Sequence, residues 1–104
     1  MTVHNALGQG QLKEEVSITL GGVEKTLVVD GTTPRAAVYF TGVGAGSRPY
    51  TIRCRTLVMI GGTARWVTSN ASGNLAVNGD LQCDLVGTYR PLTQTFDTTL
   101  RPRS

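Results

Sequence analysis

The sequence has few of the residue types from which most catalytic and metal sites are built. Its 104 residues include one histidine and two cysteines, and only 16% of them are charged. His4 cannot form a metal site with Cys54 and Cys83, because the two cysteines are far apart in the sequence and follow no metal-binding spacing. The carboxylates are scattered as well. We therefore expect no enzyme activity, no metal and no cofactor.

Long apolar runs are also absent. No stretch approaches the 18 or so apolar residues that a membrane helix needs, so we expect no contact with a membrane. The first residues lack the basic and apolar regions of a secretory signal, which indicates synthesis in a cytoplasm. In a reducing compartment the two cysteines are expected to be small buried hydrophobic side chains, with a disulfide as the alternative.

No window shows helical periodicity, and the patterns that are present have the period of a β-strand. Residues 15–20 alternate, with Val16, Ile18 and Leu20 on one face. A Gly-Gly pair and a second strand over residues 24–30 follow, which predicts a hairpin. Further strands are predicted over residues 35–41, 50–60, 63–69, 75–77, 81–86 and 93–100. The Gly-Gly pair at residues 61–62 predicts a second hairpin of the same design, over residues 50–69.

The segments between these strands are rich in turn residues. Pro49 is expected to lie outside any strand interior, and residues 70–74 are expected to form a turn. Asn78 and Gly79 carry the signal of a type I′ hairpin. Residues 1–13 are polar and without a period, which predicts an extended N-terminal arm. Residues 14–104 are then a single all-β domain, a small antiparallel sandwich or barrel-like sheet of seven or eight short strands.

The candidate site is a group of arginines and aromatic residues around the longest predicted strand. Residues 47–104 hold seven arginines and no lysine, against three aspartates. Two of the arginines point the same way from one strand, and the hairpin partner brings a third arginine or the tryptophan beside them, depending on register. The candidates for a nucleic-acid or subunit interface are Arg53, Arg55, Arg65, Trp66 and Tyr50.

Two interpretations of this group are open. A basic sheet face with aromatic residues could bind single-stranded nucleic acid through phosphate contacts and base stacking. Alternatively, Trp66 belongs to the core and the arginines pair with carboxylates on a neighbouring strand or subunit, which is the interpretation that we favour. The strand edges are rich in threonine and glycine and nearly free of lysine, which favours completion of the sheets by neighbouring copies.

Two segments resemble structural proteins of bacteriophages. Residues 16–29 resemble the first hairpin of coat proteins from single-stranded RNA phages, which dimerise into a continuous sheet, bind an RNA hairpin and end in two helices. Residues 87–104 show no helical pattern. Residues 27–38 resemble lambda-type head decoration proteins, which are small, mostly β, carry an N-terminal arm and clamp the joints between capsid subunits.

These resemblances imply a non-enzymatic virion protein, made in the host cytoplasm, and most simply a capsid decoration or cement protein. Its expected partners are copies of itself, with a major capsid protein and nucleic acid as further candidates. One alternative is an RNA-phage-type coat protein whose Arg53, Arg55 and Arg65 face RNA. Another is a free-standing small β-barrel that binds nucleic acid.

Overall fold

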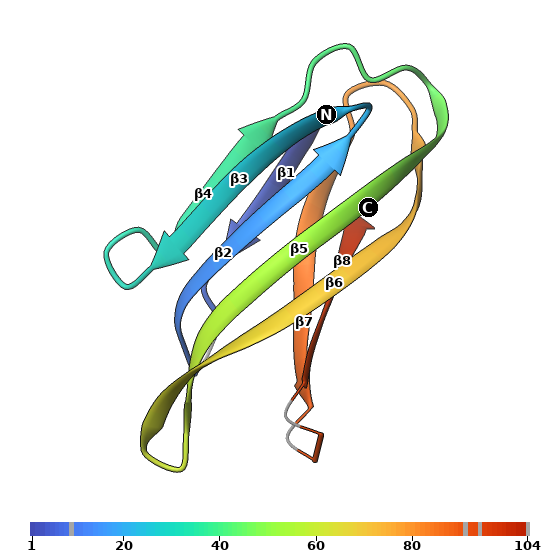
Figure 1. The fold of residues 1–104 in the computed structure, drawn as a ribbon. Helices are drawn as coiled ribbons and strands as arrows, with labels where there is room; N and C mark the ends of the chain where they lie inside the picture. The colour runs from blue at the N-terminus through green and yellow to red at the C-terminus, as the bar shows by residue number, and fades with distance from the viewer. Residues whose placement is uncertain (9, 91, 94, 104) are drawn as a thin grey trace.

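A computed structural model of the chain describes residues 1–8, 10–90, 92–93 and 95–103 (Figure 1). The described residues form eight strands and no helix, which confirms the predicted all-β class. In chain order the strands are β1 (Thr2–Ala6), β2 (Gln11–Leu20), β3 (Val23–Asp30), β4 (Arg35–Tyr39), β5 (Gly46–Ile60), β6 (Thr63–Val77), β7 (Gln82–Arg90) and β8 (Thr95–Pro102).

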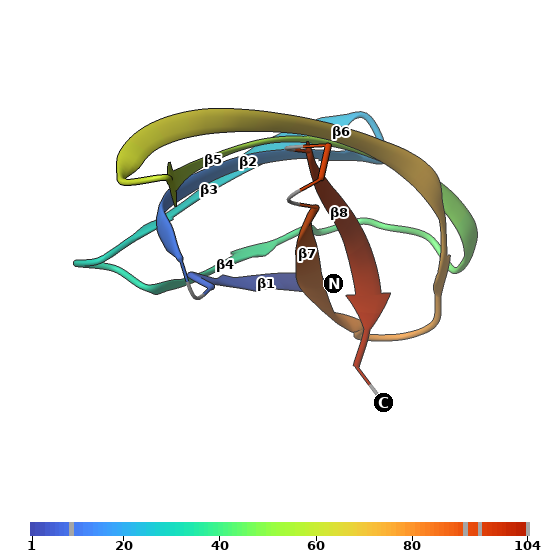
Figure 2. The ribbon, with the colours of Figure 1, turned by 90° about the horizontal axis from the view of Figure 1, so that it is seen from below.

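The strands form two four-stranded sheets that face each other as a sandwich (Figure 2). Sheet A has the order β4-β1-β7-β8, and sheet B has the order β3-β2-β5-β6. Neighbouring strands are antiparallel except β1 and β7, which are parallel. Of the two architectures predicted from the sequence, the sandwich is the one observed.

The first residues of the chain correct the prediction of an N-terminal arm over residues 1–13. Strand β1 lies inside sheet A between β4 and β7, and residues from Gln11 onward already belong to β2. Val3 is fully buried, and the amino group of Met1 donates a hydrogen bond to the carbonyl oxygen of Phe40 at 3.1 Å. The segment is ordered because two neighbouring strands satisfy its backbone and its alternate side chains enter the core. Five residues are too few to show that alternation clearly in the sequence.

Two hairpins of the same design build sheet B, as predicted. Gly21 and Gly22 join β2 to β3, and Gly61 and Gly62 join β5 to β6. All four glycines have φ between 58° and 81°, the left-handed region that a type I′ turn requires at both central positions.

Strands β5 and β6 are longer than the sequence suggested. Pro49 lies within β5, contrary to prediction, opposite Asn74 of β6. A type I′ turn closes on a hydrogen-bonded pair, here Ile60 with Thr63. From there hydrogen-bonded and non-hydrogen-bonded pairs alternate along the ladder, so Pro49 and Asn74 are a non-hydrogen-bonded pair. The nitrogen of Pro49 therefore points away from β6. It also lies beyond the end of β2, which pairs only as far as Tyr50, so the missing N–H removes no ladder hydrogen bond.

The predictions for residues 70–74 and for Asn78 and Gly79 are also wrong. Residues 70–74 continue β6 without a turn, because the extended β5 offers a partner at each position. Asn78 and Gly79 do not form a hairpin turn. They lie where the chain passes from β6 in sheet B to β7 in sheet A, and Gly79 has a φ of 64°.

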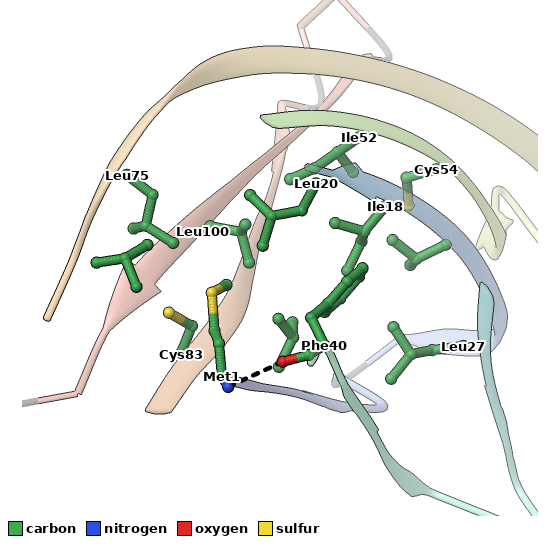
Figure 3. Packing of buried hydrophobic residues seen from close by; sticks show 13 residues of the cluster. Met1, Ile18, Leu20, Leu27, Phe40, Ile52, Cys54, Leu75, Cys83 and Leu100 are labelled. Carbon is green, nitrogen blue, oxygen red and sulfur yellow. Dashed lines mark hydrogen bonds between the residues drawn. The ribbon is translucent and has the colours of Figure 1, made fainter. Parts of the chain in front are cut away.

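The core lies between the two sheets (Figure 3). From sheet B it receives the alternation predicted for residues 15–20, with Val16, Ile18 and Leu20 at 1% exposure or less. From sheet A and its loops it receives Val3, Cys83, Leu100 and Phe40. The opposite faces of both sheets and the edge strands are therefore the surfaces available for function.

Candidate binding surfaces on the two sheets

The outer face of sheet B holds three of the five predicted site residues. Arg53 and Arg55 alternate on β5 with the buried Ile52 and Cys54, so they point away from the core. Trp66 of β6 lies directly opposite Leu57 of β5, on the same outer face. The register thus brings the tryptophan, rather than Arg65, beside the two arginines.

Both arginines of this face are paired with carboxylates of the same sheet, Arg55 on the adjacent strand β2 and Arg53 across β2 on β3. The Nε atom of Arg55 donates to Glu15 of β2 at 2.7 Å, and Nη2 of Arg53 donates to Glu24 of β3 at 3.2 Å. The guanidinium group of Arg55 also stacks on the ring of Trp66, with its central carbon 4.1 Å from the ring centroid. Such exposed contacts fix side-chain geometry more than they stabilise the fold.

The core assignment of Trp66 is wrong, whereas the pairing of arginines with a neighbouring strand is confirmed for Arg55; Arg53 pairs with Glu24 of β3, one strand further away. Trp66 is 42% exposed. Its place on the outer face follows from the two-residue turn, which sets the β5–β6 register and with it the face of every side chain in the hairpin. The sequence alone left that register open.

Arg65 and Tyr50 do not belong to this surface. Arg65 lies opposite Val58, so it is on the inward side of β6, at the exposed end of the hairpin. Tyr50 lies opposite Gly73 and packs against the core. Its hydroxyl oxygen is 3.0 Å from the point where a Cβ atom on Gly73 would sit, so the ring covers the bare glycine backbone.

The excess positive charge of the chain lies on the other sheet. Among the described residues, the outer face of sheet B has three cations, Lys13, Arg53 and Arg55, and three anions, Glu15, Glu24 and Asp30. Counted in the same way, the outer face of sheet A has four cations, Arg35, Arg90, Arg101 and Arg103, and two anions, Asp84 and Asp97. The face that carries the candidate residues for a nucleic-acid interface is therefore locally neutral.

His4 is part of the outer face of sheet A rather than of an arm. Its Nε2 atom lies 2.7 Å from Oε1 of Gln82. It lines a depression of about 420 Å³ together with Arg35, Asp84 and Arg103. Arg103 donates two hydrogen bonds of 2.8 Å to Asp84, and these bonds lower the pKa of the Asp84 carboxyl.

A buried polar network around Glu14 was missed from the sequence. Glu14 is 4% exposed and accepts hydrogen bonds from Asn5 at 2.8 Å, Gln11 at 2.7 Å and Thr56 at 3.0 Å. The sequence did contain the information: Glu14 is even-numbered like Val16, Ile18 and Leu20, so the alternation of the strand places it on the same buried face. The network ties β1, β2 and β5 together beside a pocket of about 300 Å³ at one end of the sandwich.

The two cysteines are free and buried, as expected. Burial raises the pKa of both thiols, and the charge of Glu14 raises that of Cys54 further. Within the described ranges, no three His, Cys, Asp or Glu side chains are grouped so that they could hold a metal ion. The same part of the chain contains no helix that could cross a membrane.

One edge of sheet B is unlike the other sheet edges. Strand β6 is 15 residues long and carries one charged residue, no proline and no register shift against β5. By contrast, β3 carries Glu24, Lys25 and Asp30, β8 carries Asp97, Arg101 and Pro102, and β4 has only five residues. Charges, proline, bulges and short length are the features that keep edge strands from pairing with other chains. The β6 edge has none of these protections beyond a single charge.

Comparison with protein-family models, with curated proteins and with solved structures gave no match.

Proposed function

We propose that this protein is a non-enzymatic structural component of a bacteriophage particle, and that it acts as a capsid decoration protein in oligomeric form. The observation that carries the proposal is the unprotected β6 edge, which is suited to pairing with a further strand. The resemblance of residues 27–38 to lambda-type decoration proteins supports the virion role. In the structure this segment runs from the end of β3 in sheet B to β4 in sheet A.

The RNA-phage-type coat is the less favoured candidate. The resemblance of residues 16–29 falls on the β2–β3 hairpin, a motif that many sheet proteins share. Coat proteins of that family end in two helices, whereas the described residues from 87 onward extend β7 and form β8. Arg53 and Arg55, which would face RNA, are already paired with Glu24 and Glu15.

A free-standing nucleic-acid-binding module is disfavoured by the same ion pairs. A phosphate at Arg53 or Arg55 would meet the negative charge of the carboxylate that already lies against that guanidinium group. An exposed Trp66 favours this function, since aromatic side chains stack on bases, but its ring already carries the guanidinium group of Arg55.

Two measurements on the purified protein test the proposal. Size-exclusion chromatography with light scattering is expected to show a small, discrete oligomer, and its ultraviolet absorbance ratio is expected to show no nucleic acid. Large shells that contain RNA would instead establish the coat function. A monomer at high concentration would contradict assembly of either kind.

The virion role needs a separate test. Particles purified on a density gradient from the organism that encodes the chain are expected to contain it in stoichiometric amounts, as measured by peptide mass spectrometry. Its absence from such particles would refute the virion role and leave the assembly behaviour to be explained in another way.

A further inference from the structure

The backbone of β6 presents a regular row of groups away from β5. Ile60 and Thr63 form a hydrogen-bonded pair, and such pairs recur at every second residue. The backbone N–H and C=O groups of the odd-numbered residues of β6 therefore bond to β5, and those of the even-numbered residues point away from β5. The outward row, here called the β6 edge, consists of Ala64, Trp66, Thr68, Asn70, Ser72, Asn74 and Ala76. Each residue of this row is exposed, and none takes part in the backbone hydrogen bonds between described residues outside the sheet ladders.

We propose that two copies of the chain pair through their β6 edges, antiparallel, about a two-fold axis at Asn70. This inference rests on the proposed assembly function and names its partner and geometry. The pairing joins the two copies of sheet B into one continuous eight-stranded sheet. Seven outward residues on each copy, with one N–H and one C=O each, form a ladder of up to 14 hydrogen bonds.

The register of this pairing follows from which residues of β6 face outward and from the length of the strand. Only the even-numbered residues of β6 direct their backbone N–H and C=O groups away from β5. An even-numbered residue must therefore lie opposite an even-numbered residue of the other copy. Pairing over the full length of β6 places Asn70 opposite Asn70 of the partner subunit. It places Thr68 opposite Ser72 of the partner subunit, and Trp66 opposite Asn74 of the partner subunit. All of these side chains are uncharged.

A second copy fits this edge better than a foreign strand because the edge has no charge with which to select one. Arg65 is the only charged residue of β6, and it lies five residues from the proposed axis. The two Arg65 side chains of a dimer would be ten residues apart along the ladder, roughly 33 Å at the usual strand rise. No like charges meet, and the seven-residue row is complementary to itself under the two-fold rotation that soluble homodimers most often use.

The test compares two lysine substitutions on the same face of sheet B. Asn70→Lys places two ammonium groups directly opposite each other at the axis, where like charges destabilise a strand pair. Thr51→Lys adds the same charge to the exposed face of β5, one strand away from the edge, opposite Ser72 of its own chain. Sedimentation equilibrium of the wild type and both variants gives the dissociation constant of the dimer.

We expect Asn70→Lys to raise this constant by at least about tenfold and Thr51→Lys by less than about threefold. A third variant, Thr68→Pro, removes an outward N–H that the ladder with β5 does not use. It is also expected to weaken the dimer by roughly tenfold while its circular dichroism spectrum stays unchanged.

The outcomes separate this inference from the proposed function. An oligomer that neither Asn70→Lys nor Thr68→Pro weakens would overturn the β6 pairing and leave assembly standing. Equal weakening by Asn70→Lys and Thr51→Lys would overturn the pairing as well, because the effect would then come from net charge. A wild-type monomer at millimolar concentration that also binds no other virion protein would overturn both proposals. A monomer that forms a complex with another virion protein, sensitive to Asn70→Lys, would replace the second copy by a foreign strand.

Discussion

The buried carboxylate of Glu14 offers a stringent test of the internal structure, because its neighbour provides a matched control. Glu14 and Glu15 are adjacent on β2 and point to opposite faces of sheet B. Glu14 enters the core and accepts hydrogen bonds from Asn5, Gln11 and Thr56. Glu15 remains outside and forms an exposed ion pair with Arg55.

The magnitude of the Glu14→Ala substitution follows from the donors that it leaves without a partner. Asn5 and Thr56 are buried at 6% and 0% exposure, so both would lose their acceptor inside the fold. An unsatisfied buried donor costs about 1–3 kcal/mol, which gives about 2–6 kcal/mol for the pair. A domain of this size unfolds with a free energy of about 5–15 kcal/mol, so a large share of its stability would be lost.

Glu15→Ala removes one surface ion pair, for which a loss of about 0–1 kcal/mol is expected. Urea unfolding followed by circular dichroism gives both free energies of unfolding. At about 4 °C for each kcal/mol, the melting temperatures of the two variants should differ by roughly 10 °C. If Glu14→Ala lost no more stability than Glu15→Ala, the buried network would not stabilise the fold and the assigned face of Glu14 would be refuted.

Three further predictions concern groups elsewhere in the sandwich. The two buried cysteines, whose pKa values are raised by burial, are expected to resist a thiol reagent in the native state and to react fully in denaturant; rapid native labelling would contradict their burial. Arg103 lowers the pKa of Asp84, so the stabilisation by this pair is present at neutral pH and is lost as the pH falls through the lowered pKa. An NMR titration of the Asp84 carboxyl carbon should show its midpoint rise in Arg103→Gln, and an unchanged midpoint would refute the assigned cause. Gly73→Ala should cost about 1–3 kcal/mol of unfolding free energy because its Cβ meets the ring of Tyr50, whereas Gly31→Ala, with open space around it, should be nearly neutral.

The elements of sheet B that are specified locally could be predicted from the sequence. The alternation of Val16, Ile18 and Leu20 and the two Gly-Gly turns depend on neighbours within a few residues, and the structure confirms them. The inward position of Cys54 follows from the same period of two. A core that consists of every second residue is visible in the sequence without any tertiary information.

The elements that depend on partners far along the chain could not be predicted. Strand β1 is ordered by β4 and β7, whose paired residues lie 29 or more positions away in the sequence. Pro49 fits within β5 because β2 ends at Leu20, and the end of a distant strand cannot be predicted from the residues around Pro49. The turn residues at 70–74 are overridden by a partner strand of matching length.

The candidate site was predicted in part, for the same reason. Arg53 and Arg55 share a face through the local period of two, but the choice between Arg65 and Trp66 as their neighbour depended on register. Their pairing with Glu24 and Glu15 also required the order of strands in sheet B. That order brings together residues from three strands.

The central claim, that the β6 edge pairs with a second copy about Asn70, is tested most directly by a single cysteine on that edge. In Asn70→Cys the two new thiols would lie opposite each other, with Cα atoms about 5.5 Å apart, within the range of a disulfide. In Ser72→Cys they would be four residues apart along the ladder, roughly 13 Å, too far to bond. Under mild oxidation, non-reducing electrophoresis is predicted to show a covalent dimer for Asn70→Cys and a single chain for Ser72→Cys. Equal cross-linking of both variants, or of neither, would contradict the claim.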